Sequence, residues 1–110
     1  MKSYLLDEIS APNMAVIRKY LEENAIKSGM EKIFWVQIPN DLLSTIQYEH
    51  KECQPYAFAV ELGKDWIRLE FLIRSLTHMQ CHCSGYCTEE QRNFLIGFAD
   101  KMIDTLNISV

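Results

Sequence analysis

Two strands joined by a glycine-containing turn constrain the fold of this chain more than any other feature. Residues 56–62 are almost entirely apolar, and after a three-residue turn at 63–65 the segment 66–74 alternates between apolar and polar side chains. A period of two places successive side chains on opposite faces of a strand. A three-residue turn that contains glycine is typical of a bulged hairpin. We therefore predict an antiparallel hairpin with one face that packs against other elements and one face in contact with water.

Two amphipathic helices are available to cover the packed face. The first is expected over residues 11–28, where apolar residues recur at helical spacing after Ser10, which can cap the helix. The second begins at a capping box formed by Thr88 and Gln91, and its apolar stripe continues to about residue 106. Both helices have one apolar face, so both are expected to pack on the sheet.

A further strand is expected at residues 33–38, an apolar and β-branched run that ends at Pro39. Residues 4–6 can add a short strand, residues 39–41 are expected to form a turn or a helix start, and residues 42–46 can form a short helical turn. The elements then follow in the order helix, strand, turn, strand, strand, helix. The sequence predicts a single α+β domain over residues 1–110, with two main helices on one face of a small, mostly antiparallel sheet of three to four strands.

The charge of the chain argues against several classes of partner. It has 11 Lys and Arg residues against 15 Asp and Glu residues, a formal net charge of −4. Nucleic acids and anionic membrane surfaces bind clustered positive charge, so we expect no nucleic acid and no membrane as partner. Residues 1–8 include two acids where a signal peptide needs an apolar segment, and no apolar run approaches the roughly 20 residues of a membrane span. We expect a cytoplasmic protein, in which thiols stay reduced.

All the cysteines and histidines of the chain lie between residues 50 and 87. Thiolates and imidazoles are the ligands that zinc and other soft or borderline metals prefer. Gly85 allows the chain to turn back, and the start of a helix favours a thiolate, so three of the cysteines are expected to converge at the start of the last helix. The candidate metal ligands are His50, Cys53, His78, Cys81, His82, Cys83 and Cys87.

Three interpretations of these residues are open. The first is a structural zinc site with sulfur and nitrogen ligands. The second is a thiol redox centre or an iron–sulfur cluster, the latter held by Cys53, Cys81, Cys83 and Cys87. The third is a set of reduced, packed thiols. Zinc is favoured over a cluster because histidines accompany the thiols, although the spacing matches no strong template.

An enzymatic function is not indicated. A Cys–His nucleophile needs its thiol and imidazole within hydrogen-bond reach, and the sequence shows no oxyanion hole and no acid that would orient the imidazole. The water-facing side of the hairpin combines aromatic residues with arginine, which is typical of protein-binding surfaces. Its candidate binding residues are Trp66, Arg68, Leu72, Tyr56 and Phe58. We expect a small non-enzymatic binding or adaptor domain with a zinc site, which binds a protein partner or forms a homodimer.

Overall fold

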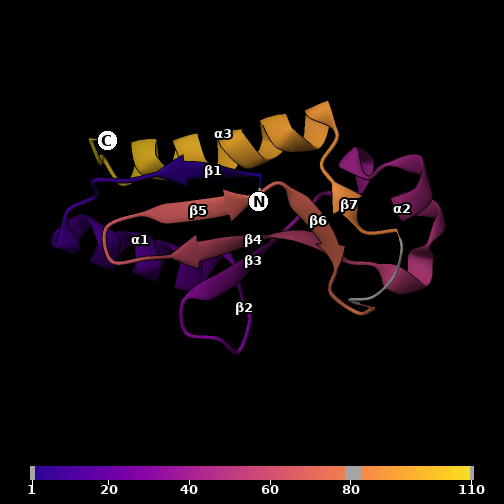
Figure 1. Cartoon of the computed structure of the whole chain (residues 1–110), viewed down its shortest axis with the longest axis horizontal. Coiled ribbons are helices and arrows are strands. Elements are labelled where there is room, and N and C mark those ends of the chain that lie inside the picture. The colour runs from indigo at the N-terminus through magenta and orange to yellow at the C-terminus, as the bar shows by residue number, and fades with distance from the viewer. Residues whose placement is uncertain (1, 79–82, 110) are drawn as a thin grey trace.

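The computed structural model describes residues 2–78 and 83–109. Figure 1 shows a sheet in the middle of the molecule, with its longest strand β4 along the long axis and the long helices α1 and α3 behind it. The strands are β1 (Ser3–Leu6), β2 (Ile26–Lys27), β3 (Ile33–Gln37), β4 (Tyr56–Leu62), β5 (Ile67–Glu70), β6 (Leu72–Ser75) and β7 (Gly85–Tyr86). The helices are α1 (Ala11–Asn24), α2 (Thr45–Glu49) and α3 (Glu89–Thr105), with 3₁₀ turns η1 (Asn40–Leu42) and η2 (Lys51–Cys53).

The sheet is larger than the sequence predicts. Over the described residues it has seven antiparallel strands accompanied by three α-helices, so the α+β class is confirmed but the expected three to four strands and two helices are wrong. Two of the additional strands, β2 and β7, have only two residues each, which is too short to show a period. The predicted second hairpin strand divides at Phe71 into β5 and β6. Of these, β5 pairs with β1 and β4, and β6 pairs with β4 and β7.

Helix α1 ends earlier than predicted. Its start is confirmed, because the Ser10 hydroxyl accepts a hydrogen bond from the Asn13 amide. Its last residue is Asn24 rather than residue 28, since Ile26 and Lys27 form β2 beside β3. A β-branched residue favours a strand over a helix. The turn from β2 to β3 then uses Gly29, whose positive φ of 90° suits a residue without Cβ.

The core lies between the sheet and helices α1 and α3. The Phe58 ring of β4 packs edge-on against Phe94 and Phe98 of α3, with centroid separations of 6.4 and 6.1 Å. Tyr20 of α1 packs against the same Phe98 at 6.3 Å. Both long helices therefore meet the same face of β4, and the opposite face of the sheet is open to the viewer in Figure 1. None of the helices in residues 2–78 and 83–109 is long and apolar enough to cross a membrane.

Two residues predicted to bind a partner belong to this core. Tyr56 and Phe58 are 1% and 0% exposed, which corrects their assignment to the water-facing side. The apolar run of β4 has no polar residue before Glu61, so its alternation does not reveal which face is buried. The small residues Ala57 and Ala59, not the aromatic ones, lie on the open side.

Candidate metal centre

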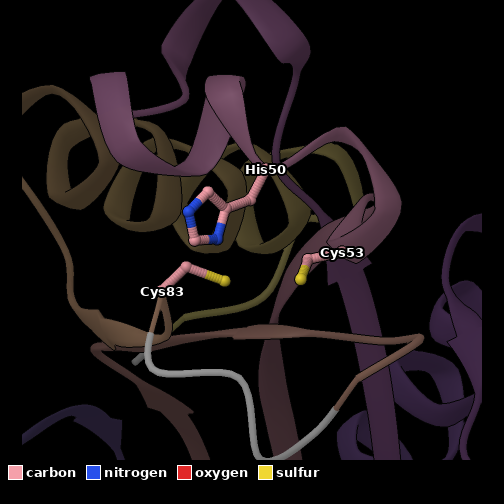
Figure 2. A group of neighbouring side chains, drawn as sticks. All are labelled: His50, Cys53 and Cys83. Atoms are coloured by element: carbon pink, nitrogen blue, oxygen red, sulfur yellow. The ribbon is translucent and has the colours of Figure 1, made fainter.

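Three of the predicted metal ligands meet at one end of the sheet. His50 and Cys53 follow α2, and Cys83 precedes β7. Their ligand atoms, one imidazole nitrogen and two Sγ atoms, all lie within 4.8 Å of one another. Figure 2 shows the three side chains turned toward one another from these two segments. The two cysteines are 3% and 4% exposed, and His50 is half-buried.

The local fold explains how His50 and Cys53 come to share one side. The backbone of His50 closes the last turn of α2 by donating to Ile46, and the amide of Cys53 donates to the carbonyl of His50 at 3.0 Å. A separation of three residues across consecutive turns places side chains on the same side. The spacing of three residues between His50 and Cys53 therefore brings their side chains close together in the folded chain.

Helix α2 is itself held in place by the start of α3. Both helices begin with capping boxes, made by Ser44 with Gln47 and by Thr88 with Gln91. The Gln91 side chain is fully buried, and its Nε2 donates to Gln47 Oε1 at 2.8 Å and to the Leu42 carbonyl at 2.9 Å. The capping box of α3 confirms the sequence prediction. The bridge between the two boxes fixes α2, and with it the position of His50.

Two buried hydroxyls connect the three ligands to the sheet. The Tyr56 hydroxyl donates to Cys83 Sγ at 3.0 Å and lies 3.4 Å from the carbonyl oxygen of His50. The Ser75 hydroxyl, from β6, donates to the carbonyl of Cys53. Hydrogen bonds of this kind orient metal ligands and tune their affinity. Neither role is evident from the sequence, because a tyrosine in an apolar strand and a serine at a strand end give no local sign of contact with residues distant in sequence.

Two other predicted ligands that the structure describes, Cys87 and His78, are not part of this group. Cys87 is half-buried and lies outside it, and His78 is exposed, with its backbone amide bonded to Ser75 Oγ at 2.9 Å. Cys81 and His82 lie outside the described residues. Burial raises the pKa of the Cys87 thiol, against smaller lowering effects from its backbone hydrogen bond and from Arg92. The predicted convergence of Cys81, Cys83 and Cys87 stays a prediction, because Cys81 lies outside the described residues; among those described, Cys83 lies with His50 and Cys53.

The donor set fits a zinc ion. Zinc binds thiolate sulfur at about 2.3 Å and imidazole nitrogen at about 2.0 Å, so two thiolates of a tetrahedral site lie roughly 3.8 Å apart. The three ligand atoms, at separations of up to 4.8 Å, need to contract by about 1 Å to meet that geometry. A tetrahedral ion has one further position, for water, for an exogenous ligand or for a side chain outside this group.

The open face of the sheet carries the remaining predicted binding residues. Trp66, Arg68 and Leu72 are all half-buried there. The Arg68 guanidinium lies 5.2 Å from the centre of the Trp66 ring and pairs with Glu61. The Trp66 ring covers Gly63 so closely that a Cβ at this position would collide with it.

Exposed apolar side chains continue this face toward both edges of the sheet. Leu5 of β1 stands opposite Arg68, and Ile26 of β2 stands opposite Trp35. Leu5 and Ile26 are 51% and 43% exposed. No family model, no curated protein and no solved structure matches this chain.

Proposed function

We propose that this protein is a small cytoplasmic binding domain in which a structural zinc ion, held by His50, Cys53 and Cys83, fixes one end of the sheet. The observation that carries the proposal is the convergence of one imidazole and two thiols to within 4.8 Å. Ligands that are far apart in sequence are gathered only by folding, so the free energy of metal binding adds to that of folding. The ion would tie the segment after α2 to the turn before β7.

The same donor set favours zinc over an iron–sulfur cluster. Clusters are held by four cysteine thiolates in most proteins, with two histidines replacing two cysteines in one class. Here the described group has two cysteines and one histidine, and Cys87 is not part of it. Mixed sulfur and nitrogen ligation is common in structural zinc sites. A zinc protein is colourless, whereas a cluster absorbs visible light, so the colour of the purified protein separates the two readily.

Elemental analysis of freshly purified protein tests the metal centre directly. We expect one zinc ion per chain, lost in Cys53→Ser and Cys83→Ser and retained in Cys87→Ser. The last variant is a matched control, because it makes the same change at a thiol outside the group. Chelation should lower the melting temperature of the parent and of the control alike. Protein without metal, and a melting temperature unaffected by chelator and added zinc, would reject the proposal.

For the binding role, the open face suits a second copy of this chain. Its strands carry two ion pairs, Arg68 with Glu61 and Arg74 with Glu70. A surface that carries both signs within itself suits pairing with its own copy about a two-fold axis, where an arginine of one copy can meet a glutamate of the other. Asp7, Glu8 and Asp65 add negative charge beside Leu5 and Trp66. The exposed Leu5 and the half-buried aromatic residues supply apolar area to bury.

Light scattering over a range of concentrations tests this association. We expect a dimer that Leu5→Asp weakens, because a carboxylate would be buried in the apolar part of the interface. Val16→Asp is the matched control, since Val16 is 42% exposed on α1, away from the open face. A monomer at all concentrations, or equal loss of association in both variants, would contradict a dimer through this face.

A further inference from the structure

We propose that Cys53 and Cys83 are a dithiol that hydrogen peroxide oxidises to a disulfide, and that this oxidation releases the bound zinc. The release of zinc rests on the metal centre proposed above, whereas the formation of the disulfide does not. The two sulfur atoms lie within 4.8 Å of each other. A disulfide bond is about 2.05 Å long, so the sulfurs need to approach by less than about 3 Å. Both are carried by single turns of the chain, η2 and the turn before β7, rather than by long rigid elements.

We assign the first reaction to Cys83. The Tyr56 hydroxyl donates to its Sγ at 3.0 Å, which holds this sulfur in position beside that of Cys53. The thiolate of Cys83 attacks one oxygen of the peroxide, and the O–O bond breaks. The sulfur becomes a sulfenic acid, and the departing hydroxide takes up one proton and leaves as water.

Cys53 then completes the reaction. Its thiolate attacks the sulfenyl sulfur of Cys83, the S–O bond breaks, and a second hydroxide leaves as water after taking up a proton. Overall, two thiols and one peroxide give one disulfide and two molecules of water, with the two electrons coming from sulfur.

The burial of the pair restricts the oxidant. Cys53 and Cys83 are 3% and 4% exposed, so a peroxide of nearly the size of water reaches them more easily than a bulky one. We expect hydrogen peroxide to react faster than cumene hydroperoxide by at least about tenfold, since reaction of a buried thiol depends on access as well as on thiolate character.

Oxidation exchanges one cross-link for another. The zinc ion and the disulfide both join η2 to the turn before β7, but two sulfurs bonded to each other no longer ligate zinc as thiolates. The metal therefore leaves while the two segments stay connected. We expect the oxidised, zinc-free protein to melt at a higher temperature than the reduced protein stripped of zinc by chelator.

The test starts from protein of measured zinc content, treated with hydrogen peroxide in the presence of a coloured zinc indicator. Supporting results are release of zinc, loss of about 2 Da in intact mass as two thiol hydrogens depart, a Cys53–Cys83 linked peptide, and reversal by dithiothreitol. Zinc that stays bound, or oxidation that links Cys87 or gives only sulfinic and sulfonic acids, would overturn the proposal and leave the metal centre intact. Protein without zinc that still forms the Cys53–Cys83 link would reject the metal centre and support the dithiol.

Single variants separate the roles of the two cysteines. Cys53→Ser removes the thiol that closes the disulfide, so a sulfenic acid should accumulate on Cys83 and react with dimedone. Cys83→Ser should give little dimedone adduct, and Cys87→Ser should form the disulfide as the parent does. Equal dimedone labelling of Cys53 and Cys83 in these variants would overturn the assigned order. Because the parent protein is mapped as well, a variant that fails to fold does not decide the outcome.

Discussion

Tyr56 links two parts of the candidate metal centre through one hydroxyl. Its oxygen lies at hydrogen-bond distance from Cys83 Sγ and from the backbone of His50, while its ring is buried in the core. Tyr56→Phe keeps the ring and removes only the hydroxyl. We expect zinc affinity to fall by about tenfold, the lower end of the range for outer-shell partners of metal ligands. Competition with a zinc-binding dye measures it. Tyr48→Phe, an exposed tyrosine on α2, should leave the affinity unchanged.

The raised pKa of the Cys87 thiol predicts how its reactivity depends on pH. Burial raises its pKa, so at a given pH less thiolate is present than in the unfolded chain. The stability that this shift contributes is present below the unfolded pKa and is lost as the pH rises through the folded pKa. In zinc-loaded protein we expect iodoacetamide to modify Cys87 more slowly than in denaturant near pH 8.5, about the ordinary thiol pKa, with a rate that keeps rising above it. Equal rates in the two states would contradict the shift.

For single residues, the sequence predicts which side chains can bind a metal better than it predicts which of them come together. The residue types of His50, Cys53 and Cys83 identify all three as candidate ligands. That Cys83 joins the other two, rather than Cys87, depends on how β6 and β7 bring the chain back across the sheet. This pairing is long-range and leaves no trace in local spacing. The buried role of Tyr56 was hidden for a related reason, since β4 is apolar on both faces.

Among the elements, the contact between the two capping boxes carries the most specific prediction. Gln91→Glu preserves the acceptor for the Thr88 amide, and in an isolated helix the two residues serve equally in a capping box. Here the change removes the donor to Gln47 and Leu42 and sets a buried carboxylate against two oxygen acceptors. We expect the free energy of unfolding to fall by about 2–3 kcal/mol.

Urea denaturation of both a buried and an exposed variant measures this cost. Gln37→Glu, at an exposed position on β3, introduces the same charge without burying it and should change stability by less than about 0.5 kcal/mol. Similar losses in the two variants would show that the added charge, not the broken bridge, is responsible. Since Gln91 holds α2, its substitution should also weaken zinc binding, which the exposed control should not do.

Elements with a strong local signal are the ones that the sequence predicts well. Helix α3 has a capping box and a long apolar stripe, and β4 and β5 have a glycine turn between them; all three are found. The strands β2 and β7 contain two residues each and exist only because a neighbouring strand offers backbone hydrogen bonds. Helix α2 also has a capping box, formed by Ser44 and Gln47. The helix has only five residues, which is too short for an apolar stripe that would identify it in the sequence. The predicted number of strands was therefore wrong because β2 and β7 form by pairing with a neighbouring strand and not from a local preference of their residues.

For the molecule as a whole, the metal centre lies at one end of the sheet, and a cluster of aromatic rings forms another part of the same core. The packed rings of Phe58, Phe94, Phe98 and Tyr20 join β4 to α1 and α3 without any metal ligand. The segments that carry the ligands are a 3₁₀ turn and a short loop beside the two-residue strand β7. Opening free energy varies along a fold, and it is lowest where few long elements pack together. Zinc should therefore affect the two parts unequally.

Hydrogen exchange with and without zinc measures this inequality. Removing zinc should speed exchange at the amides of Cys53 and Gln54, which bond to the carbonyls of His50 and Lys51 in η2. Amides of β3 paired with β4 should change by less than about threefold, because their protection comes from the sheet and the aromatic core. A uniform increase in exchange rate over the whole chain would mean that zinc stabilises the entire fold and not only one end of the sheet. An unchanged pattern, in protein shown to hold zinc, would mean that the ion adds nothing to the fold.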